Sequence, residues 1–116
     1  MAKHGALDDV LVALADPTRR AVIRRLGEGP ASVSELARPF AITLPSFLKH
    51  VRMLESSGLV RTAKSGRVRM CTLDRERLSL VDGWLDEQRR VWDERTDRLA
   101  AFVAGSAEIL ESKEQS

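Results

Sequence analysis

The chain has 116 residues, of which 43% are hydrophobic and 31% are charged. This length and composition are typical of one folded domain, which excludes a two-domain enzyme and a disordered protein. The longest unbroken apolar runs, residues 10–15 and 99–104, are too short for a membrane span or a signal-peptide core. Cys71 is the only cysteine, so no internal disulfide forms, and we expect a cytoplasmic protein.

Charge is unevenly distributed along the chain, although the net charge is only +2. Residues 1–74 carry 12 basic and 7 acidic side chains, whereas residues 75–116 carry 7 basic and 10 acidic ones. Within residues 45–70, Glu55 is the only acidic residue among six basic ones. This local excess favours binding to a polyanion, and an ordinary solvated face is the alternative.

The first two predicted elements are helices. Four apolar residues recur at helical spacing over residues 7–14, which predicts a helix with one apolar face. Asp16 followed by Pro17 is typical of an N-cap and the first turn of a second helix, which Gly27 ends.

Two more short helices follow. Ser32 and Glu35 have the spacing of a capping box, and Pro39 limits the third helix that begins there. Thr43 is placed to cap a fourth helix, which Gly58 ends.

The remainder of the chain predicts a β-hairpin and a long helix. Residues 60–63 and 68–73 are two short strand-like runs, and the four residues between them contain a glycine. In the second run Val68, Met70 and Thr72 alternate with a second set of residues, which is the period of a half-buried strand; the second set is Arg67, Arg69 and Cys71. From residue 76 to about residue 103 only Gly83 weakens a helix. We expect one domain over residues 1–104 and a polar, flexible tail at 105–116.

This order of elements predicts a mainly α fold with a small β-hairpin, a winged helix-turn-helix arranged α-α-α-α-β-β-α. A helical wheel of the fourth helix, at about 100° per residue, separates two faces. The predicted core stripe consists of Leu44, Phe47, Val51 and Leu54. The predicted outward arc consists of Pro45, Ser46, Lys49, Arg52 and Met53.

The outward arc and the hairpin have the chemistry that duplex DNA requires. Arg and Lys bind phosphates and base acceptors, and hydroxyl and imidazole groups also reach phosphates. The predicted DNA-binding residues are Thr43, Ser46, Lys49, His50, Arg52, Lys64, Ser65, Arg67 and Arg69. The alternative is an amphipathic surface helix beside an edge hairpin that cations protect from aggregation.

Four segments resemble the ArsR/SmtB-type winged helix repressors. They are LADPTRRAVIRRL at residues 14–26, SELA at 34–37, LPSFLKHVRML at 44–54 and SGLV at 57–60. The resemblance implies a dimeric transcriptional regulator, usually a repressor, whose fourth helix binds an inverted-repeat operator. It also implies that Lys49, His50 and Arg52 belong to the recognition helix, and that Gly66 and Arg67 form the tip of the wing.

The chain departs from this family pattern at two places. Many members have a serine before the Lys-His pair, where this chain has Leu48, so Leu48 either covers a thymine methyl or packs beside the third helix. The metal-sensing members carry cysteines in the third helix or histidine and acidic ligands in the last one, and the corresponding helices here contain no cysteine or histidine. The sequence WLDEQRRVW at 84–92 is similar to the metal-independent branch.

Other chemistry has little support in the sequence. His4, His50 and Cys71 lie on separate segments, which disfavours a metal site, a cofactor or a nucleophilic pair, and we expect no enzymatic activity. A redox role for Cys71 stays open. Trp84 and Trp92 lie near one face of the last helix and serve either core or dimer packing, or an effector pocket.

We therefore expect a homodimeric repressor that occupies a DNA operator, with no identified small-molecule effector. Apolar residues at alternating steps of three and four in the last helix predict its dimer seam, which Gln88 and Arg95 interrupt. The predicted dimerisation residues are Leu7, Leu11, Leu78, Leu85, Trp92, Leu99 and Phe102. A helical protein-interaction adaptor without DNA binding is the competing hypothesis.

Overall fold

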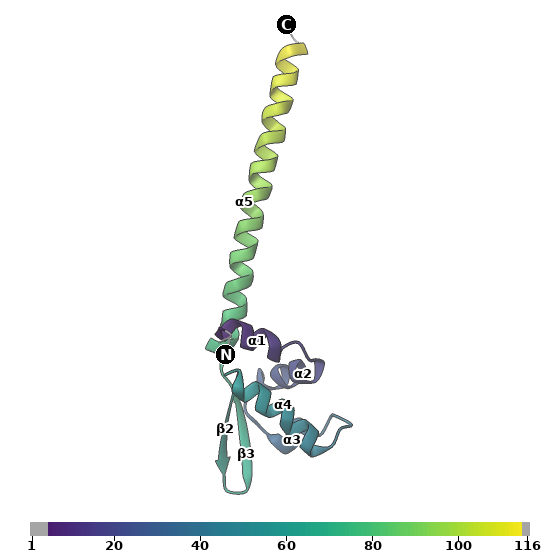
Figure 1. Ribbon diagram of the computed structural model, residues 1–116, viewed down its shortest axis with the longest axis vertical. Helices are drawn as coiled ribbons and strands as arrows, with labels where there is room; N and C mark the ends of the chain where they lie inside the picture. Colours follow the sequence, from purple (N-terminus) through teal and green to yellow (C-terminus); the bar gives the residue numbers. More distant parts are fainter. Residues whose placement is uncertain (1–4, 115–116) are drawn as a thin grey trace. The chain divides into compact units, whose positions relative to one another are not determined.

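The computed structural model describes residues 5–114, with side chains through residue 106 (Figure 1). The described elements are, in chain order, α1 (Ala6–Ala13), α2 (Pro17–Leu26), β1 (Ala31–Ser32), α3 (Val33–Ala37), α4 (Leu44–Ser56), β2 (Val60–Ser65), β3 (Val68–Leu73) and α5 (Arg75–Glu114). The predicted mainly helical fold with a small β element is confirmed. None of the described helices is both long and apolar enough to cross a membrane.

The chain divides into two units, Met1–Val81 and Asp82–Ser116, and α5 contributes to both. The boundary between the two units lies within residues 1–104, which were predicted to form one domain. That single domain stays a prediction. Helix α5 continues to Glu114, past the predicted end near residue 103 and through most of the predicted flexible tail. Strong helix formers dominate that segment, and a single interior glycine costs only about 1 kcal/mol. Residues 115–116 lie outside the described residues.

Three predicted N-caps are confirmed. Each side chain accepts a hydrogen bond from the backbone N–H three residues further on, at 3.0 to 3.4 Å; the caps are Asp16, Ser32 and Thr43. Ser32 also donates its hydroxyl to Oε1 of Glu35 at 3.2 Å, so the capping box closes through the two side chains. These caps satisfy N–H groups that a helix leaves unpaired in its first turn.

The sheet has three antiparallel strands in the order β1-β3-β2, where the sequence predicted two. The additional strand, β1, has only two residues, which pair with Met70 and Cys71 of β3. A strand of two residues is too short to show the alternation of apolar and polar residues by which a sequence predicts a strand. Strand β2 runs to Ser65, so the hairpin turn consists of Gly66 and Arg67 alone. Gly66 has φ +63°, which suits the first residue of such a tight turn.

The core of the first unit lies among α1, α2, α3, α4 and the sheet. Three of the four residues in the predicted stripe of α4 are buried: Phe47, Val51 and Leu54. Leu44 is 54% exposed, so its prediction was wrong. Helical side chains point toward the N-terminus, and Leu44 is the first residue of α4, so its side chain lies beyond the core.

The alternation predicted for β3 is present, and the buried face is the one that carries Cys71. Cys71 is fully buried, whereas Val68 and Thr72 are exposed and Met70 is half-buried. Cys71 pairs with Ala31 on one side and with Thr62 on the other, at the part of the sheet that covers the core. Alternation reveals that one face is buried, but it does not identify which one when both faces carry apolar residues.

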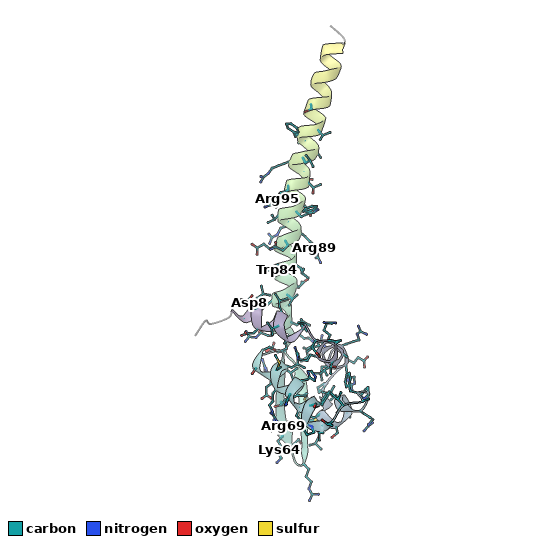
Figure 2. The ribbon with its side chains drawn as sticks, turned by 45° about the vertical axis from the view of Figure 1, so that its right-hand side comes forward. Asp8, Lys64, Arg69, Trp84, Arg89 and Arg95 are labelled. Carbon is teal, nitrogen blue, oxygen red and sulfur yellow. The ribbon has the colours of Figure 1, made fainter. Side chains whose placement is uncertain are left out.

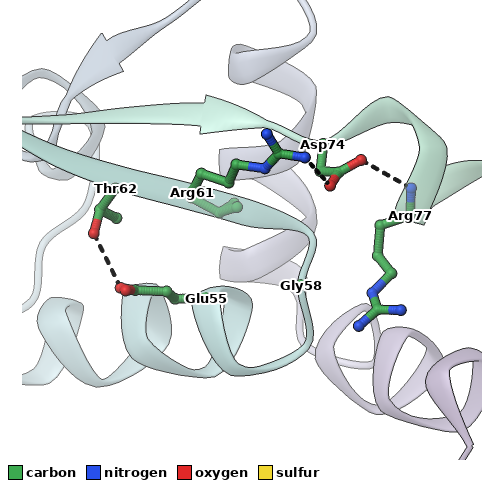
Figure 3. A pocket seen from close by; sticks show the side chains of 7 residues that line it. Glu55, Gly58, Arg61, Thr62, Asp74 and Arg77 are labelled. Atoms are coloured by element: carbon green, nitrogen blue, oxygen red, sulfur yellow. Dashed lines mark hydrogen bonds and ion pairs between the residues drawn. The ribbon is translucent and has the colours of Figure 1, made fainter.

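A close contact joins the end of α4 to the start of α5. Nε of Arg77 donates to the carbonyl of Ser57 at 3.0 Å, and its guanidinium occupies the space that a side chain on Gly58 would need. Gly58 has φ +83°. The carboxylate of Asp74 accepts from the Arg77 backbone N–H at 3.1 Å and from Nη2 of Arg61 at 2.8 Å, at the edge of a hollow of about 520 Å³ (Figure 3).

We expect acid to destabilise the fold partly through Asp16. The backbone N–H of Arg19 is the main cause that lowers the pKa of Asp16 from its ordinary 3.8. This contribution to the free energy of unfolding is present above the unfolded-state pKa and is lost as the pH falls through the lower folded-state pKa. Asp16→Asn keeps a cap acceptor but removes the titration, so urea unfolding below about pH 4 should show a shallower dependence on pH. An unchanged dependence would contradict this role.

Candidate nucleic-acid interface

One face of α4 presents cationic and polar side chains to solvent. The predicted outward arc is confirmed, because Pro45, Ser46, Lys49, Arg52 and Met53 are all exposed. Neither Lys49 nor Arg52 forms a salt bridge with a described residue. Both charges are therefore available to an external anion.

Two hydroxyl groups lie at the start of this face. The oxygen of Thr43 accepts from the Ser46 backbone N–H, and its proton is donated to Oγ of Ser46 at 3.0 Å. A hydroxyl has one proton, so that of Thr43 is used within the helix turn. The proton of Ser46 is left for an outside acceptor.

The register of the hairpin determines which of the predicted residues share a face. Lys64 pairs with Arg69, and directly paired residues share a face of a sheet (Figure 2). This face also carries Thr62 and the buried Cys71, so it is the face that turns toward the core. Ser65, which pairs with Val68, lies on the opposite face. The predicted hairpin residues are thus split between the two faces and the turn, where Arg67 is exposed.

Hydrogen bonds connect the α4-facing side of the hairpin to α4 itself. Nη1 of Arg69 donates to Oγ1 of Thr62 at 2.7 Å, and Thr62 donates to Oε2 of Glu55 at 3.2 Å. Arg69 and Arg52 line the same hollow of about 360 Å³. A cation of the hairpin and a cation of α4 therefore face one shared space.

Arg61 does not belong to this cationic group. It pairs with Thr72 on the other face of the hairpin, and Nη2 forms a 2.8 Å ion pair with Asp74 (Figure 3). Arg61 also helps to lower the pKa of Asp74, after the backbone N–H of Arg77. The charge excess counted over residues 45–70 thus overstates the cations that share the α4 side.

His50 is half-buried at the edge of the α4 face. Its Nδ1 lies 3.1 Å from Nη1 of Arg19 and 3.7 Å from Oδ2 of Asp16, both at the start of α2. The wheel placed His50 at the edge of the outward arc, and the structure adds this inward contact.

Sequence reasoning missed Arg19. The side chain is only 9% exposed, and it donates Nε to the carbonyl of Ala13 at 2.6 Å and Nη2 to that of Val12 at 3.2 Å. The signal was present, because Arg19 takes the first place of the helical stripe that Val22, Ile23 and Leu26 continue. A charged residue in an apolar stripe indicates a buried and paired group.

Leu48 is half-buried and packs against the core of the first unit. It also lines the hollow that Arg52 and Arg69 share. This packing supports the structural interpretation of Leu48 over a contact with a thymine methyl.

The thiol and possible metal ligands offer no second site in the described part of the chain. Burial is the main cause that raises the pKa of the Cys71 thiol, which disfavours the reactive thiolate and weakens the redox hypothesis. Among the described residues, no three histidine, cysteine or acidic side chains form a group that would hold a metal ion.

The predicted dimer seam falls into two parts. Leu78 is partly buried and packs against the core of its own chain, as does Val81. Further along α5, Trp92 is 69% exposed, Leu99 is 63% exposed and Phe102 is 72% exposed. Leu85 and, on α1, Leu11 are also exposed, whereas Leu7 is half-buried. The apolar residues that need a partner are therefore concentrated in the second unit, where Figure 2 also shows Trp84.

Comparisons with known proteins agree with this geometry. A profile described as "Helix-turn-helix domain" matches residues 14–63, which contain α2, α3, α4 and the start of the hairpin. The HTH-type transcriptional regulator Rv2034 of Mycobacterium tuberculosis is 32% identical over 113 residues, which are 97% of this chain and 96% of that protein.

Solved structures show the same fold. The crystal structure of an ArsR family transcriptional regulator is 54% identical, with a TM-score of 0.74, over 77% of this chain and 98% of that one. A homodimeric winged helix-turn-helix DNA-binding domain of Mycobacterium bovis is similar in fold, with a TM-score of 0.59 and 24% identity over 76% of this chain and 93% of that one.

We expect Leu48→Ser to lower the free energy of unfolding by about 1 to 3 kcal/mol, because it removes apolar packing and places a hydroxyl against the core. The preference for individual DNA bases should not change. The matched control is Met53→Ser on the exposed side of the same helix, which should cost less than about 0.5 kcal/mol. Melting curves and a panel of single-base DNA substitutions provide the two measurements. Altered base preference with unchanged stability would instead indicate a DNA contact.

Proposed function

Because this chain belongs to the ArsR family of transcriptional regulators, we propose that it acts as a homodimeric repressor that binds an inverted-repeat DNA operator through α4 and the β2–β3 hairpin. It is a DNA-binding transcriptional regulator and not an enzyme, in agreement with the names of its relatives. Repression would follow from occupancy, because a dimer on a promoter blocks access of the polymerase. A DNA-binding regulator acts where its DNA is, so we propose the cytoplasm as its location.

The observation that carries the proposal is the set of exposed cations on α4 and the hairpin. Lys49 and Arg52 lie on the outward face of α4, and Arg69 reaches the hollow that Arg52 also lines. A helix of this kind fits the major groove, while cations at its side bind the flanking phosphates. The hydrogen bonds from Arg69 through Thr62 to Glu55 support a fixed position of the hairpin beside α4. We assign phosphate contacts to Lys49, Arg52 and the hairpin, and base contacts to the other exposed side chains of the α4 face.

The exposed apolar residues of α5 support a second copy of this chain as the partner. Trp92, Leu99 and Phe102 continue a seam of coiled-coil spacing, and water contact with so many large apolar groups is costly. Charges beside the seam pair within the helix, as Asp86 does with Arg90. A seam repeated in an identical chain is self-complementary, and the Mycobacterium bovis domain of the same fold is described as homodimeric.

We also propose that the protein belongs to the metal-independent branch of the family. Its single cysteine is buried in the sheet, and His50 is held against the start of α2. Neither side chain is positioned to join a ligand cluster with the other. We therefore propose that DNA binding does not respond to metal ions.

We expect the salt dependence of DNA binding to identify the surface. Each phosphate contact contributes about 0.9 to the slope of log K against log salt, so a dimer carrying Lys49→Ala and Arg52→Ala should lose up to about four contacts and bind with a much flatter slope. The control pair, Arg89→Ala and Arg98→Ala on α5, removes the same charge and should keep the slope. Genomic fragments selected by the protein would supply the DNA, with half-site centres about 34 to 36 Å apart. Equal slopes for both pairs would contradict the assignment.

The oligomeric state provides an independent prediction. Sedimentation at micromolar concentration should show a dimer, and Leu99→Glu should shift it toward monomer because a carboxylate is costly at an apolar seam. Ala100→Glu introduces the same charge at an exposed position beside the seam and should leave the dimer intact. A folded wild-type monomer at that concentration would refute dimerisation through α5.

Metals should not release the DNA. With no ligand cluster among the described residues, stoichiometric zinc, cadmium or copper is expected to leave gel-shift affinity unchanged, and Cys71→Ala should bind DNA like the wild type. The thiol should react with iodoacetamide only after urea unfolds the chain, because it is buried. Metal-dependent release that disappears in Cys71→Ala would overturn the branch assignment.

A further inference from the structure

The contact between Arg19 and His50 joins a buried side chain to the predicted recognition helix. Nη1 of Arg19 lies 3.1 Å from Nδ1 of His50. A guanidinium has only N–H donors and no acceptor, so Nδ1 has to supply the lone pair. A neutral imidazole that accepts at Nδ1 carries its proton on Nε2. A protonated ring would instead direct an N–H toward the N–H of Arg19.

Arg19 is itself held in place, which fixes the contact. Nε and Nη2 donate to the carbonyls of Ala13 and Val12 at the end of α1, and the side chain is 9% exposed. Asp16 is the other charged group beside the ring, with Oδ2 at 3.7 Å from Nδ1. The distance to Asp16 is longer than a hydrogen bond, so the short contact with Arg19 determines the tautomer.

The second nitrogen of His50 reaches solvent. Nε2 makes no hydrogen bond with a described residue, and no buried side-chain nitrogen or oxygen in the described part of the chain lacks a partner. Nε2 is therefore accessible, on the helix that carries Lys49 and Arg52. With the proton on Nε2, this accessible atom is a hydrogen-bond donor.

We propose that Arg19 is a positioning residue for DNA recognition, because it fixes His50 as the Nε2–H tautomer and so presents a neutral donor to an acceptor atom of the DNA. The proposal rests on the proposed function for its DNA partner. The tautomer itself belongs to the free protein. His50 then contributes directional hydrogen bonding to the α4 face, whereas Lys49 and Arg52 contribute charge.

Nitrogen-detected NMR of the free protein tests the tautomer without DNA. In the wild type, Nε2 should resonate as a protonated ring nitrogen and Nδ1 as an unprotonated one, with no averaging between them. Arg19→Lys should introduce averaging, because a lysine ammonium lacks the guanidinium fork that holds the ring. Averaged or reversed signals in the wild type would overturn the proposal. The NMR measurement tests the tautomer independently of DNA binding. If genomic selection recovers no DNA, that outcome rejects the proposed function and not the tautomer.

Binding measurements test the consequence for DNA. Glutamine places an amide N–H about where Nε2 lies, whereas asparagine reaches only about as far as Nδ1. The affinity of His50→Gln for DNA should therefore lie within about threefold of the wild-type affinity. The affinity of His50→Asn should fall roughly tenfold, which is the contribution of a hydrogen bond to a charged acceptor. Similar losses in both variants would overturn the donor role.

A double-mutant cycle separates positioning from simple support of the fold. Arg19→Lys should weaken DNA binding several-fold in the wild type but have almost no effect in His50→Gln, which no longer depends on a tautomer. Thermal melting of each variant selects a temperature at which all are folded. An equal loss in both backgrounds would mean that Arg19 acts only through the stability of the fold, and the proposal would fail.

Discussion

The arrangement of α1, α2 and α4 in the first unit depends on the hydrogen bonds of the Arg19 guanidinium. One buried side chain of α2 satisfies carbonyls at the end of α1 and contacts the ring of His50 on α4. The Val12 carbonyl also accepts from the Ala15 backbone N–H at 3.2 Å, whereas the Ala13 carbonyl lies at the end of α1, where Arg19 supplies its buried donor. Removing the arginine would leave the Ala13 carbonyl unpaired and would remove one of the contacts between α2 and α4. The α4 face that we propose to bind DNA is therefore positioned in part by a residue that does not lie on it.

A second set of contacts sets the hairpin relative to α4. Glu55, Thr62 and Arg69 form a chain of hydrogen bonds from the helix to both strands of the hairpin. These hydrogen bonds bring Arg69 next to the outward face of α4. Glu55, the acidic residue in this basic region, therefore has a structural role. The negative charge of Glu55 weakens the attraction of this region for DNA, but Glu55 positions Arg69 where we propose a phosphate contact.

Local signals predicted much of this fold because they act over a few residues. Caps at Asp16, Ser32 and Thr43 and breaks at Gly27 and Gly58 located the helices, and the period of the apolar residues identified which side of α4 faces the core. The failures have tertiary causes. Strand β1 exists only because β3 lies beside it, and the inward face of β3 is chosen by what it packs against.

The candidate site was predictable in composition but not in its connections. The helical wheel of α4 correctly predicted that Lys49 and Arg52 are exposed. The separation of Arg61 from Arg69 depends on hairpin register, and the length of the turn that sets this register was overestimated. The inward contact of His50 involves Arg19, 31 positions earlier, and no local pattern links two residues so far apart.

The junction at Gly58 restricts how this sequence is free to diverge. A side chain there would meet both an unfavourable positive φ and the guanidinium of Arg77. A side chain at position 58 would have to displace this guanidinium and break its hydrogen bond to the Ser57 carbonyl, and asparagine, which accepts left-handed backbone best, is the substitute that the positive φ disfavours least.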